Sequence, residues 1–365
     1  MTSLHPDGRP SILMIARGLD PIGTGRQIEL AAEGFRAAGW NVHLAVTTAG
    51  GAVPARLTEA GVSVQRLSTR PVVDMAAAVG LAQLARALRP STILAWGRSQ
   101  TRLTAALVPV LHRTRLVCRL AVPPRGVVTG LAMRRAHRVI VASPGVATAC
   151  LRLGVPAARI DTGLPGALPA AAAGVSRAEI AARLGLDSEK IWTLCVAPLV
   201  AESRLERLLW AIDQLGVVHR HLDHVLVGAG PLYDRMRRRA RAQQLAERLH
   251  VVPHLECLPD LLREVRLVWQ SGTVAYGGAV LDGMALGVSA VAVTSDAARQ
   301  LIVDGVTGRI VSADPESDFP RRALGVIEDD SLALQYGEAA RARAASEFSA
   351  ERMVAAVVAA CEPSA

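Results

Sequence analysis

A glycine-rich stretch in the C-terminal half of the chain combines residue types that can hold a phosphate. Gly277 and Gly278 follow a run of small residues, and the good helix formers 279–286 come directly after them. Backbone N–H groups at a helix N-terminus, together with the helix dipole, favour an anion. Asp282 lies about one turn inside this helix and can reach a polar group of the same ligand. A buried helix with a tight start is the alternative interpretation of this stretch alone.

Two further glycine turns follow predicted strands. Gly23 and Gly25 come after the first apolar run of the chain, and Gly228 and Gly230 come after a later one. Such turns can bring backbone donors close to a phosphate, but small glycine turns recur in unrelated folds. The first turn lacks the G-x-G-x-x-G spacing of a dinucleotide-binding dehydrogenase. Open parallel sheets bind ligands beyond the carboxyl ends of their strands, so we expect these loops at that edge.

Short apolar runs alternate with helical patterns along the chain, which predicts an α/β fold with doubly wound parallel sheets. The expected strands are residues 11–16, 42–47, 62–67, 92–96, 116–120, 139–142, 192–196, 225–227, 249–255, 266–269, 288–293 and 308–311. The alternation dissolves once, in a stretch rich in Pro, Gly and Ala around residues 164–174. Two Rossmann-like domains facing a cleft are therefore expected.

The expected domain bounds follow from this interruption. The N-terminal domain covers residues 1–167, a linker covers 168–180, and the C-terminal domain covers 181–347. Residues 348–365 are predicted to form a C-terminal helix after a break near Phe348 and Ser349. That this helix packs back on the N-terminal domain stays open.

Composition narrows the class of protein. Of the 365 residues, 51% are hydrophobic and 3% are aromatic, which suits parallel strands and helices better than an aromatic-rich antiparallel sandwich. The net charge of +9 comes from arginine, because Lys190 is the only lysine, and the shortage of stacking aromatics argues against a nucleic-acid partner.

Five dispersed cysteines without C-x-x-C spacing indicate reduced thiols. We expect a cytoplasmic protein, with a peripheral contact at the inner membrane face left open.

Two clusters of polar residues have a simple structural interpretation. Three histidines, His219, His221 and His224, are expected in a helix-to-strand turn and lack a partner at a recognised metal-binding spacing. We therefore predict no metal and no cofactor. The arginines at positions 235, 237, 238, 239 and 241 are expected on a solvated helix face, and attraction to an anionic membrane surface is the alternative.

The glycine-rich stretch also resembles the C-terminal motif of the family-four (group 1) retaining glycosyltransferases. Tyr276, Gly277, Met284 and Ala285 fit that motif, and residues 23–25, 136–146, 227–232, 302–308 and 337–343 resemble its other signatures in the same order. This resemblance covers nearly the whole chain. It implies the two-domain GT-B fold, a nucleoside diphosphate sugar as donor, and glycosyl transfer with retention. The donor contacts that it implies are Gly23, Gly25, Gly228, Gly230, Gly277, Gly278 and Asp282.

Several positions that carry charge in this family are substituted here. Pro198 stands at the family's Arg and Ser203 at its Lys, the two cations that hold the donor diphosphate. Val274 replaces the first Glu of the motif, Asp282 the second, and Trp96 the His of the N-terminal domain. Losing two charge-assisted hydrogen bonds costs about 3 to 6 kcal/mol of donor or transition-state binding.

Neighbouring side chains could compensate for these losses. Arg204 follows the vacated Lys position, and Arg207 lies one helical turn beyond it, so either could contact the phosphates. Arg98 and Ser99, just past the fourth predicted strand, are candidate acceptor contacts.

Two classes of function stay open: a glycosyltransferase with a reshaped site, and a catalytically inactive relative that acts as a binding or regulatory partner, for example of an active transferase. A nucleotide-sugar epimerase or a dehydrogenase is the remaining alternative. The donor sugar, the nucleotide, the acceptor and the oligomeric state do not follow from the sequence.

Overall fold

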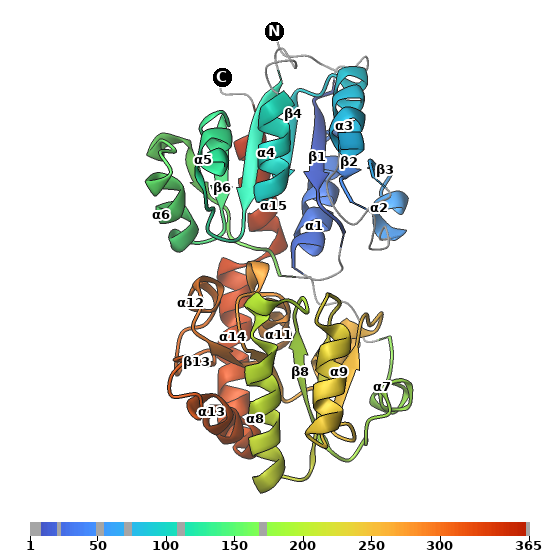
Figure 1. The fold of residues 1–365 in the computed structure, drawn as a ribbon, viewed down its shortest axis with the longest axis vertical. Coiled ribbons are helices and arrows are strands. Elements are labelled where there is room, and N and C mark those ends of the chain that lie inside the picture. The colour runs from blue at the N-terminus through green and yellow to red at the C-terminus, as the bar shows by residue number, and fades with distance from the viewer. Residues whose placement is uncertain are drawn as a thin grey trace. The chain divides into compact units, whose positions relative to one another are not determined.

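The structure, a computed structural model, describes residues 9–19, 23–48, 55–68, 75–107, 114–167 and 174–362. The chain divides into two compact units, one formed by Met1–Gly166 with Ala350–Ala365 and the other by Ala167–Ser349. Each unit contains one parallel sheet with helices on both faces (Figure 1). The predicted α/β class with two doubly wound parallel sheets is therefore confirmed.

The N-terminal unit is built on a seven-stranded sheet with the order β3-β2-β1-β4-β5-β6-β7. Its strands are β1 (Ser11–Ala16), β2 (Asn41–Val46), β3 (Ser63–Arg66), β4 (Thr92–Trp96), β5 (Arg115–Leu120), β6 (Arg138–Val141) and β7 (Ile160–Thr162). The central strands β1 and β4 are buried along their whole length, as expected for a sheet covered on both faces. The sequence did not predict β7, because this edge strand has only one apolar residue and is held by pairing with β6.

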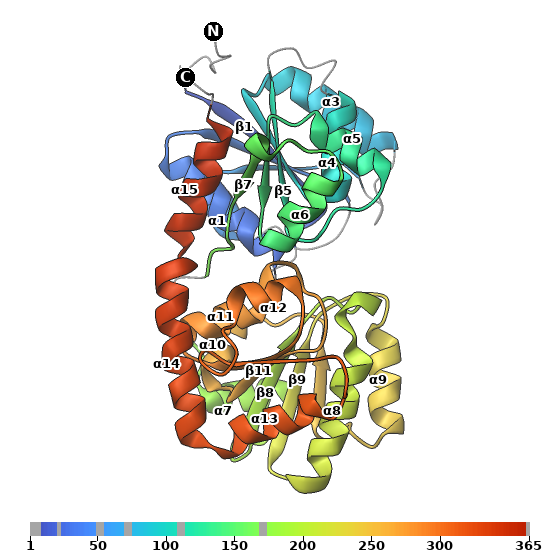
Figure 2. The same ribbon diagram turned by 90° about the vertical axis from the view of Figure 1, so that its left-hand side faces the viewer.

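Helices cover both faces of this sheet. They are α1 (Thr24–Ala37), α2 (Ala55–Glu59), α3 (Met75–Leu88), α4 (Arg98–Leu107), α5 (Val127–Arg134), α6 (Pro144–Arg152) and α15 (Ala350–Cys361), with a 3-10 turn η2 (Ala157–Arg159). Figure 2 shows α3 to α6 on one face and α1 with α15 on the other. The contact between α1 and α15 is close, because a Cβ added at Gly34 would lie 2.2 Å from Val354 Cγ1. The end of the chain is thus part of the N-terminal unit.

The C-terminal unit has a six-stranded sheet with the order β10-β9-β8-β11-β12-β13. Its strands are β8 (Ile191–Val196), β9 (Leu222–Val227), β10 (Leu249–Val252), β11 (Leu267–Gln270), β12 (Ser289–Val293) and β13 (Arg309–Val311). Its helices are α7 (Arg177–Leu184), α8 (Leu205–Val218), α9 (Tyr233–Ala242), α10 (Leu258–Glu264), α11 (Ala279–Leu286), α12 (Asp296–Leu301), α13 (Asp318–Glu328) and α14 (Asp330–Glu347), with 3-10 turns η3 (Ala201–Ser203) and η4 (Ala275–Gly277). The break that separates α14 from α15 falls at Phe348 and Ser349, as predicted.

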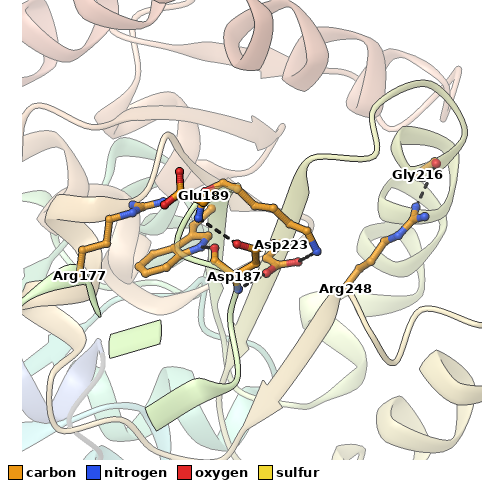
Figure 3. Close-up of polar contacts among 8 residues, drawn as sticks. Arg177, Asp187, Glu189, Gly216, Asp223 and Arg248 are labelled. Atoms are coloured by element: carbon orange, nitrogen blue, oxygen red, sulfur yellow. Dashed lines mark hydrogen bonds and ion pairs between the residues drawn. The ribbon is translucent and has the colours of Figure 1, made fainter. Parts of the chain in front are cut away.

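A cation–π contact and a hydrogen bond from Arg177 hold α7 against the amino end of β8 (Figure 3). The Arg177 guanidinium lies 3.8 Å from the centre of the Trp192 ring and donates to the carbonyl oxygen of Lys190 at 2.6 Å. The Lys190 ammonium is 3.1 Å from a carboxylate oxygen of Asp223, which is buried in β9. A capping box between Ser176 and the first turn of α7 starts this helix. No helix in the described part of the chain is long and apolar enough to cross a membrane.

Candidate functional site

The loop between β11 and α11 places Gly277 and Gly278 at the carboxyl end of β11. Tyr276, Gly277 and Gly278 have φ angles of 55°, 75° and 50°, so three successive residues are left-handed. Glycine adopts this region readily, but a tyrosine does so at a cost that its surroundings must offset. Tyr276 is buried, with 4% of its surface exposed. A turn of this kind can orient successive backbone N–H groups toward an anion.

Helix α11 begins without a side-chain cap. Gly278 occupies the N-cap position and offers no side-chain oxygen to the N–H groups of the first turn. Asp282 lies in this first turn with 9% of its surface exposed. The glycine loop and the helix over residues 279–286 are therefore as the sequence predicts.

Both glycines of this loop also have a packing role. A Cβ added at Gly277 would lie 2.0 Å from Leu301 Cδ1, and one added at Gly278 would lie 2.9 Å from Val274 Cγ1. Real Cβ atoms do not approach other heavy atoms so closely. These positions require glycine for the fold, with or without a ligand.

The turn Gly228 to Gly230 packs directly on the loop that follows β8. A Cβ added at Gly228 would lie 1.9 Å from the Ala197 carbonyl oxygen, and one at Gly230 would lie 2.6 Å from that of Leu199. The Leu199 N–H donates to Ala229 O at 2.9 Å, which joins the two loops. The loops after β8 and β9 therefore meet at the carboxyl edge of the sheet because these glycines have no side chains.

The loop after β11 joins the same assembly. Thr273 N–H donates to the Glu202 carbonyl oxygen at 3.0 Å, and the Ser271 hydroxyl donates to that of Ser203 at 2.8 Å. Four of the predicted donor residues, Gly228, Gly230, Gly277 and Gly278, are thus brought to one edge of one unit.

The substituted positions have structural contacts of their own. The Ser203 hydroxyl donates to the Pro198 carbonyl oxygen at 2.6 Å, and Ser203 is 1% exposed. Val274 is buried in the hydrophobic core of the C-terminal unit. The side chains at these positions hold the loop and the core together.

Arg204 and Arg207, the two arginines predicted to contact the phosphates, differ from each other in exposure and in their contacts. Arg204 is exposed, has a φ of 50° and forms the N-cap of α8. Arg207 lies in the first turn of α8, where its Nε is 3.5 Å from a carboxylate oxygen of Glu316. A phosphate that recruits Arg207 therefore has to compete with this carboxylate.

In the N-terminal unit, Gly23 and Gly25 form the start of α1, and residues 20–22 of the predicted loop lie outside the described part. Gly23 is the N-cap with a φ of 70°, and Gly25 is buried in the first turn. Arg98 and Ser99 are the first two residues of α4, which begins one residue after the end of β4. Arg98 is exposed and Ser99 is partly exposed.

Arg119 is a candidate that the sequence analysis missed. It lies near the carboxyl end of β5, is 1% exposed, and its guanidinium is 5.0 Å from the centre of the Trp96 ring at the end of β4. Its Nη2 donates to Leu164 O at 3.3 Å. A buried arginine at this edge of a parallel sheet can contribute positive charge to a ligand site. The signal in the sequence is a charged residue inside the apolar run 116–120.

The histidine cluster needs one correction. His224 lies within β9 and not in a turn, because the strand begins at Leu222. Its Nδ1 is 2.6 Å from the Thr193 hydroxyl. Burial, reinforced by Arg248, lowers the pKa of His224 to about 3, so this is a neutral core residue. The described residues include no group of His, Cys, Asp or Glu that could hold a metal ion.

Two family models match the chain. The model for the glycosyl transferase 4-like domain matches residues 23–166, and that for glycosyl transferases group 1 matches residues 176–343. A curated phosphatidyl-myo-inositol mannosyltransferase from Mycolicibacterium smegmatis is 34% identical over 65 residues, which are 18% of this chain and 17% of that protein.

Solved structures with a similar fold cover almost the whole chain. Anabaena Alr3699/HepE in complex with UDP and glucose has a TM-score of 0.81 at 17% identity, over 95% of this chain and 98% of that one. Sucrose-phosphate synthase from Thermosynechococcus elongatus has a TM-score of 0.78 at 16% identity, over 96% and 98%. These likenesses establish the GT-B fold. The two family models match one unit each and together cover residues 23–166 and 176–343, and on these matches the chain belongs to the group 1 glycosyltransferase family.

Proposed function

We propose that this protein binds a nucleoside diphosphate sugar and transfers its glycosyl group with retention. The observation that carries the proposal is the carboxyl edge of the C-terminal sheet, where α11 begins uncapped behind a left-handed turn and Asp282 lies one turn inside. Family membership supports it, as does the similar fold of Anabaena Alr3699/HepE, whose structure contains UDP-glucose.

Each predicted residue has a role in this proposal. The N–H groups at Gly277 and Gly278 would bind a phosphate or the sugar, where the helix dipole adds attraction for negative charge. Asp282 would accept a hydrogen bond from a ribose hydroxyl. Gly23 and Gly25 would approach the diphosphate, and the turn at Gly228 and Gly230 would complete the donor site.

Arginine and backbone donors would balance the donor's charge without a metal ion. Arg207 or Arg204 would contact the diphosphate, since guanidinium groups bind phosphate oxygens through two parallel hydrogen bonds. Arg98 and Ser99 would contact the acceptor at the start of α4.

Isothermal titration with uridine, guanosine and adenosine diphosphosugars tests donor binding. We expect one nucleotide class to bind, and Asp282→Asn to weaken it while the thermal unfolding midpoint stays close to that of the wild type. NMR of the anomeric proton of the product tests retention. If none of the donors binds, the proposal fails.

A second function is favoured by the substituted positions. The Ser203 hydroxyl donates to the Pro198 carbonyl oxygen, and Val274 packs in the core, so the Ser203 and Val274 side chains already have structural contacts. In this alternative the protein is an inactive relative that binds an active transferase. It predicts co-purification with that enzyme and no turnover by the isolated chain, and robust turnover by the pure protein would rule it out.

Helix α9 is the surface for which the sequence left membrane contact open. Arg235 in this helix pairs with Glu206 at 3.3 Å, and Arg237 lies 5.8 Å from the centre of the Tyr233 ring, so part of its charge is already engaged. A cytoplasmic protein that touches the anionic inner membrane face through α9 remains part of the proposal. Charge reversal at Arg238 and Arg241, followed by sedimentation with anionic vesicles, tests it.

A further inference from the structure

A pocket of about 390 Å³ lies at the amino edge of the N-terminal sheet. The starts of β5 and β6, the residues after α5 and the turn η2 surround it. Its lining residues are Arg115, Arg135, Ala136, His137, Arg138, Ala158 and Arg159. All strands of this sheet are parallel, so the amino edge is the end opposite the one that carries Arg98 and Arg119. Within this unit, the pocket therefore lies at the opposite edge of the sheet from Arg98 and Ser99.

Backbone carbonyl groups hold the arginines of this pocket in place. Arg138 Nη1 donates to Ala158 O at 3.0 Å, and Arg159 Nη1 donates to Arg134 O at 3.1 Å. Arg135 Nη1 donates more weakly to a carbonyl in α4, at 3.4 Å. A guanidinium group has five N–H donors, so these bonds fix its position and leave most donors for a ligand.

The charge in the pocket is poorly balanced. Asp161 pairs with Arg138 at 3.3 Å, but in the described part of the chain no carboxylate lies within ion-pair distance of Arg115, Arg135 or Arg159. The Nε of Arg115 is shielded from solvent and has no hydrogen-bond partner among the described residues. A buried donor without a partner is costly, and in a native structure it points to a missing ligand or water.

His137 adds a neutral donor to this pocket. Leu116 N–H donates to His137 Nδ1 at 3.1 Å, so the proton of the neutral ring is on Nε2. Burial, followed by the charges of Arg115 and Arg159, lowers the pKa of His137. The direction of this shift fits the positive potential that the arginines create, and an anion would reverse the electrostatic part of it.

A pocket of about 490 Å³ in the C-terminal unit provides a contrast. There, Arg177 pairs with Glu264 and Lys190 with Asp223; Figure 3 shows Arg177 and Asp223 in this region. The cations of that pocket are neutralised within the protein. Around the N-terminal pocket the sequence offers few carboxylates, because residues 75–160 contain thirteen arginines and no aspartate or glutamate.

We propose that the N-terminal pocket binds a phosphate-bearing anion, either a phosphate ester in solution or the phosphate of a lipid headgroup. Planar guanidinium groups with several free donors match phosphate oxygens, and an anion would relieve the repulsion between the clustered cations. A lipid source is compatible with the exposed Leu131 of α5, which lies one turn before Arg135. The inference is independent of glycosyl transfer.

Titration with inorganic phosphate, followed through the imidazole NMR signals of His137, tests this proposal directly on the wild-type protein. We expect a saturable shift and a raised pKa of His137, because a bound anion favours the imidazolium. Sodium chloride at the same ionic strength should give no saturable shift, since it only screens charge.

A matched pair of variants locates the binding. Arg135→Gln should weaken phosphate binding about tenfold or more, as expected for a lost charge-assisted hydrogen bond. Arg134→Gln removes the same charge from the adjacent residue, which is exposed like Arg135 but does not line the pocket, and should change the affinity by no more than about twofold. Arg135→Lys keeps the charge but loses the planar fork, so an intermediate affinity is expected.

Two further measurements, titration with glycerol phosphate and sedimentation with vesicles, distinguish a soluble phosphate ester from a lipid headgroup. Saturation by glycerol phosphate without sedimentation on phosphatidic acid vesicles indicates a soluble ester. Sedimentation of the wild type and Arg134→Gln, but not of Arg135→Gln, on these vesicles and not on phosphatidylcholine indicates a lipid headgroup. An equal loss in both variants, or no saturable response of His137, overturns the proposal. Donor titrations on the same variants are separate measurements, so this failure would leave the glycosyl-transfer proposal intact.

Discussion

The ion pair between Arg207 and Glu316 allows a quantitative test of how this protein holds a diphosphate. The Arg207 side chain is 20% exposed and that of Glu316 is 46% exposed, with 3.5 Å between Nε and the carboxylate oxygen. A pair that is this accessible contributes about 0.2 to 1 kcal/mol. A charge-assisted bond from Arg207 to a donor phosphate is worth about 1.5 to 3 kcal/mol. When Arg207 leaves Glu316 and binds a donor phosphate, the net gain in donor binding is therefore about 1 to 2 kcal/mol, or about 5-fold to 30-fold in donor affinity.

Two substitutions act on the two sides of this exchange. Arg207→Ala should weaken donor binding by about 5-fold to 30-fold in isothermal titration. Glu316→Gln removes the competitor and should strengthen donor binding by about 2-fold to 5-fold, with little loss of stability. Arg238→Ala, on the exposed face of α9, is the control for net charge. An unchanged donor affinity in Arg207→Ala, in a protein that binds the donor, would refute this reasoning and favour the inactive-partner alternative.

Other predictions concern the fold that supports the site. Lys190→Met leaves the buried Asp223 carboxylate without its cation and should lower the free energy of unfolding by about 2 to 4 kcal/mol in urea titration; a loss under about 1 kcal/mol would contradict this. Gly228→Ala should destabilise by more than about 3 kcal/mol or prevent folding, whereas Gly325→Ala, with open space around it on an exposed helix face, should stabilise by about 0.5 to 1 kcal/mol. His224 is neutral in the fold down to a pKa of about 3, whereas the unfolded chain takes up its proton near its usual 6.5. Its contribution to stability is therefore complete above about pH 6.5 and is lost, by up to about 1.4 kcal/mol per pH unit, as the pH falls toward 3. His224→Asn should flatten this dependence in denaturant titrations over the same pH range.

The sequence by itself determined the architecture, because the hydrophobic period and the turn residues are local signals. The bounds of β1, β4 and α11 agree with those predicted from these patterns. Gly277 and Gly278 predicted the start of a helix, because glycines directly before a run of helix formers are also a local signal. The α/β class and the family resemblance also needed no tertiary information, since both depend on the order of short motifs along the chain.

Contacts between distant residues were decided only by the tertiary structure. Strand β7 forms because β6 offers it hydrogen bonds, and His224 lies in a strand because its backbone pairs with Thr193 of β8. Nothing local predicts that Ser203 turns inward to Pro198 O, or that Arg207 has a carboxylate partner.

The arginine cluster of the N-terminal pocket is the clearest example of a feature that only the tertiary structure decided. Arg115, Arg135 and Arg159 are scattered in sequence, and each alone is typical of a solvated surface. The fold brings Arg115 at the start of β5, Arg135 after α5 and Arg159 in the turn η2 to one pocket. Electrostatic repulsion depends on distance in space, so a site made of scattered like charges becomes visible only in the folded chain.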